Sequence, residues 1–199
     1  SEVIKPDDKP SHVIRKRKDS SMGAAIEALR DKKVDALVSA GNTGALMGMS
    51  KFVLKTIEGI NRPAIAGLMP TLRGESVILD LGANIECNDQ NLIDFAELGS
   101  ALFKSLFPNE KAKVALLNVG SEEMKGTEIL KLASERLKGL SNEKTFLYNG
   151  YIEGNNIMSG ESNVIVTDGF TGNIALKTAE GTSKFIIKNL KKSLTENIL

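Results

Sequence analysis

The chain has 199 residues, with 26 Lys and Arg against 25 Asp and Glu, and its formal net charge at pH 7 is +1. Because this balance creates no strong field for a polyanion, no nucleic-acid partner is expected. With 41% hydrophobic and 26% charged residues the composition is that of an ordinary globular protein, and every apolar stretch is far shorter than the roughly 20 residues of a membrane-spanning helix.

Short β-type runs bounded by Gly, Asn and Pro alternate with longer segments of helical period, which is typical of an α/β sheet covered by crossover helices. Up to Pro63 the predicted elements are a strand tail at 2–4, a helix at about 20–29, a strand at 35–39 and a helix at 46–57. Asp19 or Ser20 is the expected N-cap of the first helix, and Gly59 is expected to end the second.

The alternation continues through the rest of the chain, with strands at 64–68 and 76–81, a helix at 92–106, a strand at 113–118, a helix at about 127–137, and strands at 145–148 and 163–167. A last helix begins after Gly172. We predict an open, mostly parallel sheet with helices on both faces, forming a single α/β catalytic domain over residues 1–199 with a helical extension over about 173–199.

The chain opens on Ser1, within what reads as the tail of a strand, and its last residues continue a helical pattern without a stop signal. We therefore expect a fragment that lacks N-terminal and C-terminal parts.

The sequence contains one cysteine, Cys87, and one histidine, His12. A zinc site needs about four His, Cys or carboxylate ligands, so a Cys/His cluster is excluded, and neither a metal nor another cofactor is expected. His12 is interpreted as a surface residue rather than a catalytic base. A single cysteine cannot form an internal disulfide, and the charged start of the chain is no secretory signal. A cytoplasmic protein is expected.

Five turns that follow predicted strands contain both Gly and Asn, at 40–44, 81–84, 118–120, 149–150 and 168–173. Ligands of open α/β sheets bind beyond the carboxyl ends of the strands, where Gly lets the backbone approach a ligand and Asn or Thr donates hydrogen bonds. The first and last turns share G-x-T-G at a strand-to-helix junction, which suits an anion. Each turn alone is also ordinary turn chemistry, but the series favours a phosphate site.

Seven segments carry a more specific signal: KDSSM at 18–22, VSAGNTGALM at 38–47, RPAI at 62–65, LDLGANIEC at 79–87, LLNVGSEEMKG at 116–126, YNGYIEGNNI at 148–157 and VTDGFTGNIALKTAEG at 166–181. In order and spacing they resemble the bacterial PlsX family, the phosphate acyltransferases of phospholipid synthesis. The resemblance covers nearly the whole chain.

The resemblance implies transfer of a long-chain fatty acyl group from acyl carrier protein to inorganic phosphate, giving acyl phosphate for phosphatidic acid synthesis. It also implies a homodimer and a fold similar to phosphotransacetylases and to isocitrate and isopropylmalate dehydrogenases. The motif D-x-x-T-G-N-x-x-x-K, from Asp168 to Lys177, is similar to one in phosphotransacetylases. The family usually has an acidic, double-glycine turn before these segments and a glycine-rich segment after the long helix, so part of the active site is expected to be missing.

Phosphate is anionic at neutral pH and a thioester is an activated acyl donor, so the reaction needs positioning more than proton transfer, and direct attack is expected. Asp168 is the expected catalytic carboxylate that orients the donor, and Lys125 or Lys177 is expected to offset negative charge. The candidate phosphate- or acyl-binding residues lie in the turns: Gly41, Asn42, Thr43, Gly44, Gly82, Asn84, Gly169, Thr171, Gly172 and Asn173.

Two other functions stay open. A phosphotransacetylase acting on short acyl-CoA shares the last motif, and a noncatalytic phosphate-binding domain could regulate lipid synthesis through the same loops.

The last predicted helix carries an apolar stripe flanked by lysines: Phe185, Ile186, Leu190, Leu194 and Ile198 with Lys184, Lys188, Lys191 and Lys192. This pattern favours dimerisation or peripheral contact with the inner face of the membrane, and the lysines would attract anionic lipid or the acidic carrier protein. Packing of the helix on its own domain is the other interpretation.

Overall fold

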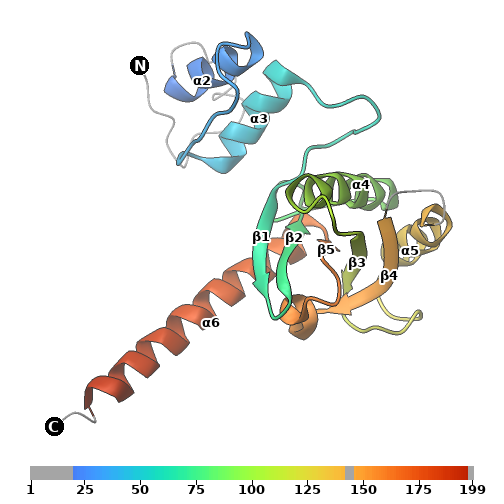
Figure 1. Cartoon of the computed structure of the whole chain (residues 1–199). Helices are drawn as coiled ribbons and strands as arrows, with labels where there is room; N and C mark the ends of the chain where they lie inside the picture. Colours follow the sequence, from blue (N-terminus) through green and yellow to red (C-terminus); the bar gives the residue numbers. More distant parts are fainter. Residues whose placement is uncertain (1–19, 142–145, 197–199) are drawn as a thin grey trace. The chain divides into compact units, whose positions relative to one another are not determined.

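The computed structural model describes residues 20–141 and 146–196 (Figure 1). Contacts divide the chain into two compact units, Ser1–Pro63 and Ala64–Leu199. The strand tail predicted at 2–4, His12, and Ile198 at the end of the apolar stripe lie outside the described residues. The single catalytic domain expected over residues 1–199 stays a prediction.

The first unit is built on two helices, α2 (Ser21–Arg30) and α3 (Thr43–Leu54). Of the two predicted N-caps, Ser20 is the one that caps α2, because its Oγ accepts a hydrogen bond from the N–H of Gly23 at 3.0 Å. The two helices bury one small apolar cluster between them, formed by Met22, Ile26, Ala45 and Met49. Helix α3 ends three residues before the predicted Ile57.

The strand predicted at 35–39 is wrong, since these residues have no regular secondary structure. The run is apolar enough for a strand, yet Val38 is 99% exposed. A strand is stable only where a neighbouring strand satisfies its backbone groups and a second layer buries its side chains. The described residues provide neither a neighbouring strand nor a second layer for this segment. Its apolar pattern alone is therefore not sufficient to form a strand.

The second unit contains a five-stranded sheet in the order β1-β2-β5-β3-β4. Its strands are β1 (Ala66–Thr71), β2 (Gly74–Leu79), β3 (Ala112–Asn118), β4 (Phe146–Glu153) and β5 (Val164–Val166). Strand β1 pairs antiparallel with β2, and all other pairs are parallel. The mostly parallel α/β sheet is therefore confirmed, and each strand predicted after residue 63 overlaps an observed one.

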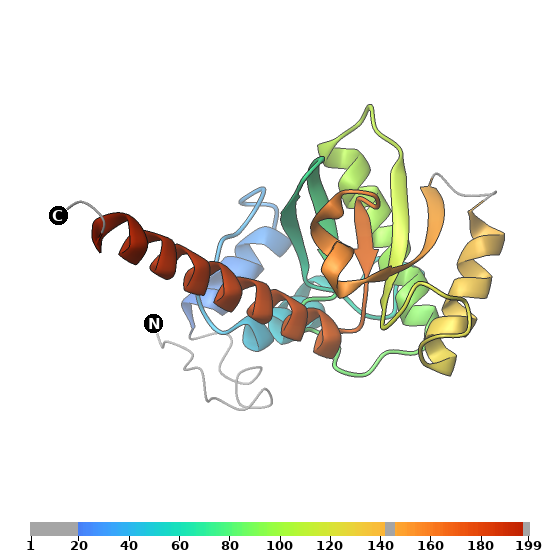
Figure 2. The same cartoon turned by 90° about the horizontal axis from the view of Figure 1, so that it is seen from below.

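Helices cover both faces of this sheet (Figures 1 and 2). On one face, α4 (Asp89–Leu106) and α5 (Glu128–Leu140) pack over Val77, Val114 and Val164 in the larger apolar cluster. On the other face, the short 3₁₀ helix η2 (Gly154–Ser159) and the start of α6 (Gly169–Glu196) pack over Ile78, Ala115 and Ile165. Alternate residues of β2, β3 and β5 thus belong to different clusters, as the period of two requires.

Helix α6 begins in contact with the sheet and then extends beyond it, as both views show (Figures 1 and 2). Residues 181–195 are exposed throughout, which confirms a C-terminal helical extension. Among the described residues, no helix combines the length and the apolar content that a bilayer crossing requires.

Candidate active site

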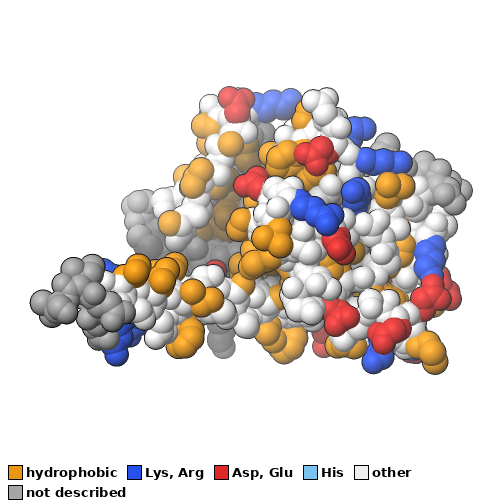
Figure 3. Space-filling view, turned by 60° about the horizontal axis from the view of Figure 1, so that its bottom comes forward, with side chains coloured by type: hydrophobic (Ala, Val, Ile, Leu, Met, Phe, Trp, Pro, Cys, Tyr) orange, Lys and Arg blue, Asp and Glu red, His pale blue; other side chains and the backbone are white. Residues whose placement is uncertain are grey.

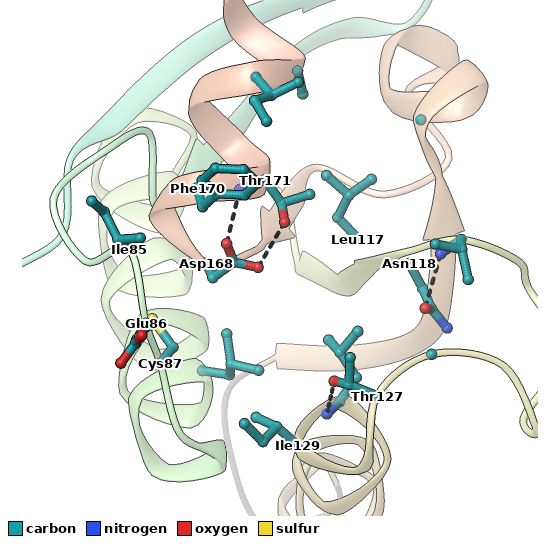
Figure 4. Close-up of a pocket in the computed structure, with 17 residues that line it drawn as sticks. Ile85, Glu86, Cys87, Leu117, Asn118, Thr127, Ile129, Asp168, Phe170 and Thr171 are labelled. Atoms are coloured by element: carbon teal, nitrogen blue, oxygen red, sulfur yellow. Dashed lines mark hydrogen bonds between the residues drawn. The ribbon is translucent and has the colours of Figure 1, made fainter.

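A cavity of about 940 Å³ lies at the carboxyl ends of the parallel strands of the second unit (Figure 4). Each parallel strand contributes to its wall through the residues that follow or end it: Cys87 after β2, Asn118 in β3, Gly154 after β4 and Asp168 after β5. This is the edge at which open α/β sheets bind ligands, because the loops and helix starts converge there.

Three helices complete the wall with their first turns. Leu92 comes from α4, Ile129 and Leu130 come from α5, and Phe170 and Thr171 come from α6. Figure 4 shows Phe170 and Thr171 at one side of the cavity and Ile129 at the opposite side.

An ion pair ties α5 to the start of α4 beside the cavity. Arg136 donates to Asp89 Oδ2 at 2.6 Å and to Gln90 Oε1 at 2.5 Å. The hydrogen bond from Arg136 lowers the pKa of the Asp89 carboxyl below its ordinary value. Because both partners are partly exposed, the contribution of this pair to stability is modest.

Asp168 lines the cavity and caps the first turn of α6 through Thr171. The N–H of Thr171 donates to Asp168 Oδ1 at 2.8 Å, and the Thr171 hydroxyl donates to Oδ2 at 2.8 Å (Figure 4). Both carboxylate oxygens are therefore oriented by one residue. A carboxylate held in this way can still accept a further hydrogen bond from a ligand in the cavity, since each oxygen has two lone pairs.

The turn 168–173 is seated directly on the loop 80–84 that follows β2. The N–H of Gly169 donates to the carbonyl of Asn84 at 2.8 Å, and Asn173 Nδ2 donates to the carbonyl of Leu81 at 3.1 Å. A Cβ on Gly172 would lie 1.9 Å from the carbonyl oxygen of Asp80. The two motifs LDLGAN and DGFTGN are therefore one packed unit, which brings together the predicted residues Gly82, Asn84, Gly169, Gly172 and Asn173.

Asp80 organises this packed unit, and the sequence reasoning missed it as a functional candidate. The side chain is fully buried and accepts hydrogen bonds from the N–H groups of Ile65, Gly82, Ala83 and Asn84 and from the side-chain amide of Asn84. A carboxylate within an apolar strand end is the signal that could have found it, since buried charges are rare unless they are bonded in this way.

The two lysines predicted to offset charge do not line the cavity. Lys177 pairs with Glu180 at 3.0 Å on the exposed surface of α6. Lys125 lies 4.0 Å from Glu122 and is more than half exposed. Lys125 lies between β3 and α5 and Lys177 lies in α6, and each side chain contacts an exposed glutamate. Their catalytic roles stay predictions.

The first G-x-T-G turn, at Gly41–Gly44, belongs to the first unit. Asn42 caps α3, with its Oδ1 accepting from the N–H of Ala45 at 2.9 Å, and the N–H of Gly41 donates to Ser39 Oγ at 3.2 Å. Thr43 is the first residue of α3. The turn has the expected helix-start geometry, and its pairing with the turn at 169–172 in one phosphate site stays a prediction.

The fold has a solved counterpart. The structure of the EutD phosphotransacetylase from Staphylococcus aureus superposes with a TM-score of 0.64, covering 92% of this chain and 67% of that protein at 17% sequence identity. At this identity the likeness shows the fold, and it confirms the phosphotransacetylase-like architecture expected from the resemblance.

Sequence comparisons extend over the whole chain. The phosphate acyltransferase of Pelagibacter ubique is 54% identical over 198 residues, covering 100% of this chain and 59% of that protein. That of Paramagnetospirillum magneticum is 48% identical, covering 100% and 56%, and that of Rhodospirillum centenum is 50% identical, covering 100% and 55%. The chain thus spans somewhat more than half the length of these curated relatives. A family model described as "Fatty acid synthesis protein" matches residues 1–199, so the resemblance to the PlsX family is confirmed and the chain belongs to that family.

Proposed function

We propose that this chain forms part of an enzyme that transfers a long-chain fatty acyl group from acyl carrier protein to inorganic phosphate, giving acyl phosphate for phosphatidic acid synthesis. The carrying observation is the seating of the turn 168–173 on the loop 80–84 beside a cavity, in a chain about half identical to proteins named phosphate acyltransferase. Membership in a family of fatty acid synthesis proteins does not depend on this proposal.

The proposed reaction is direct attack of a phosphate oxygen on the thioester carbonyl. The new bond joins phosphate oxygen to the acyl carbon, the carbon–sulfur bond breaks, and the carrier protein leaves as its thiol or thiolate. Phosphate is already an anionic nucleophile, so the protein needs to hold the two reactants in line. We propose that the turns Gly41–Gly44 and Gly169–Asn173 each bind phosphate or the developing oxyanion, with Asp168 orienting the donor and Lys125 or Lys177 offsetting charge.

The test is release of free thiol from palmitoyl carrier protein by the full-length protein, with and without phosphate. We expect release that depends on phosphate, and arsenate in place of phosphate should give net thioester hydrolysis because acyl arsenate decomposes in water. Faster turnover of acetyl-CoA than of palmitoyl carrier protein would instead support a phosphotransacetylase. Binding of phosphate without any thiol release would support a noncatalytic regulatory domain.

Replacing Thr171 or Asn173 by Ala should raise the phosphate concentration that gives half-maximal rate. Asn173 keeps one amide proton for phosphate, so its replacement removes a hydrogen bond to a charged ligand, worth roughly 1.5–3 kcal/mol or about tenfold or more. The Thr171 hydroxyl donates to Asp168, so its replacement acts through the turn that this bond orders. The measurement is the initial rate as a function of phosphate concentration. Thr178→Ala, an exposed position on the same helix, is the matched control.

Both side chains also make hydrogen bonds within the protein, so their loss can act on stability alone. Thr171 bonds Asp168 and Asn173 bonds Leu81, so both residues also have a structural task. A lower free energy of unfolding with an unchanged phosphate dependence would assign them to that task alone.

We also propose that the protein is cytoplasmic and that α6 mediates self-association or peripheral contact with the inner face of the membrane. Phe185 is 67% exposed and Leu194 is 60% exposed, and Figure 3 shows hydrophobic side chains along the part of α6 that extends from the sheet. The described side chains of this stripe are exposed and do not form part of the core of their own unit. Exposed apolar surface of this kind favours a partner or a lipid surface.

Replacing Leu190 and Leu194 together with Ser should weaken self-association or binding to anionic vesicles, because the apolar face loses two of its large side chains. Sedimentation velocity and vesicle flotation measure the two effects. Thr195→Ser, on the same helix, serves as the control. A double variant that sediments and floats like the unmodified protein would refute the role of the stripe.

A further inference from the structure

The wall of the cavity is mainly apolar from its interior to its mouth. Leu92 and Leu117 are 2% and 6% exposed and form its buried part, whereas Ile85, Val119 and Phe170 are more than half exposed. The apolar surface is therefore continuous from solvent to the core of the sheet. Ligand pockets of roughly 300–1,000 Å³ with such walls bind apolar groups and use a few polar atoms for orientation.

The charges around the cavity do not favour an anion inside it. Among the described residues that line it, the charged side chains are Glu86 and Asp168, and no Lys or Arg is present. A phosphate placed among apolar walls near two carboxylates would lose hydration without gaining a cation. The cavity itself is thus better suited to the neutral part of a donor than to phosphate.

The polar side chains of the wall are partly committed to the protein itself (Figure 4). Asn118 accepts from the N–H of Val119 at 2.9 Å and donates to the carbonyl of Lys125 at 3.1 Å. Thr127 accepts from the N–H of Leu130 at 3.3 Å, which caps α5. These bonds use part of the capacity of both side chains and leave one amide proton of Asn118 and the hydroxyl proton of Thr127 for a ligand. The pair Asp168 and Thr171 is the polar edge at the start of α6.

We propose that this cavity holds the hydrocarbon chain of the acyl donor, with the thioester at the polar edge formed by Asp168 and Thr171 and with phosphate outside the cavity. This inference rests on the proposed acyl transfer and adds the place of the acyl chain to it. The chain enters between the exposed side chains of the mouth, and its distal methylene groups lie against Leu92 and Leu117. The cavity then limits the length of chain that the enzyme accepts.

Gly154 offers a way to fill the cavity without straining the backbone. It lines the cavity, a Cβ built on it meets nothing within 4 Å, and its φ is not in the left-handed region. In Gly154→Leu the new side chain occupies space that the acyl chain uses. Gly139, on α5, also has nothing within 4 Å of a Cβ but does not line the cavity, so Gly139→Leu is the matched control.

The experiment compares kcat/KM of the full-length enzyme for palmitoyl and butyryl carrier protein. Gly154→Leu should lower kcat/KM for the palmitoyl donor by about tenfold relative to the butyryl donor, the loss expected when roughly two methylene groups are no longer buried. Gly139→Leu should leave the ratio of the two donors unchanged. An unchanged ratio in Gly154→Leu, in a variant that folds normally, would overturn the proposal.

A second experiment measures whether the cavity is occupied, without any catalytic turnover. Cys87 is the single cysteine of this chain and lines the cavity, so its alkylation by N-ethylmaleimide reports access. Palmitic acid should slow the modification of Cys87, identified by mass spectrometry with Cys87→Ser as the blank, and inorganic phosphate alone should not. Equal labelling with and without palmitic acid would overturn the proposal.

The two experiments also separate this inference from the proposed function. Protection of Cys87 by palmitic acid in an enzyme that shows no phosphate-dependent thiol release would support the acyl cavity and refute the transfer reaction. Phosphate-dependent release with neither protection nor a change in chain preference would support the reaction and refute the cavity as its acyl site.

Discussion

Gly172→Ala is expected to unfold the start of α6 and to remove activity with it. The added Cβ would lie 1.9 Å from the carbonyl oxygen of Asp80, which is backbone, and 2.8 Å from a methyl carbon of Thr167. Relief of such overlap requires helix α6 to move off the loop 80–84, because no flexible side chain can give way. We expect a loss of roughly 3 kcal/mol or more in the free energy of unfolding, measured by urea denaturation.

The same helix provides the control. Gly181 lies in the interior of α6, and a Cβ added to it would meet nothing within 4 Å. Gly181→Ala should therefore raise stability by about 0.5–1 kcal/mol, since Ala is favoured over Gly within a helix. Equal stability of Gly172→Ala and Gly181→Ala would show that α6 does not pack closely on the loop 80–84. The geometry of the candidate active site would then be incorrect as well.

Asp80→Ala is the second change with a large expected effect. The carboxylate accepts from the N–H of Ile65 at 3.0 Å and from the N–H of Asn84 at 2.7 Å, with three further donors in the loop. Removal of the acceptor leaves the two buried donors of Asn84 and three partly buried backbone N–H groups without this partner. The cost is roughly 3 kcal/mol or more, because each unsatisfied buried group costs about 1–3 kcal/mol.

The readout for Asp80 is the thermal midpoint together with the activity at a temperature where the variant is folded. The thermal midpoint of Asp80→Asn should lie between those of the unmodified protein and Asp80→Ala. Its amide keeps one acceptor oxygen, but its NH₂ group is a donor and cannot accept from the N–H groups that surround it. Glu110→Ala, at an exposed position, should change stability by no more than about 0.5 kcal/mol. A stable Asp80→Ala variant would show that the loop 80–84 is held by other contacts.

Local pattern alone was sufficient for much of the second unit. The strands that became β2 and β3 were predicted to within two residues, because each is a short apolar run bounded by polar and turn residues and is largely buried. Ser20, one of the two predicted N-caps, and the start of α5 next to the predicted residue 127 also follow from the local sequence, whereas α3, α4 and α6 begin at least three residues before their predicted starts. Family membership was likewise readable, since the seven segments occur in the family's order along the chain.

The tertiary structure alone decided which of these residues meet. The strand expected at 35–39 failed because pairing depends on a partner that the local sequence does not encode. Cys87 and Leu92 meet Asp168 and Phe170 in one site only because the sheet order places β5 beside β2. The cavity has no local signal for the same reason: its wall joins strand ends and helix starts separated by up to about ninety residues, and only folding brings them together.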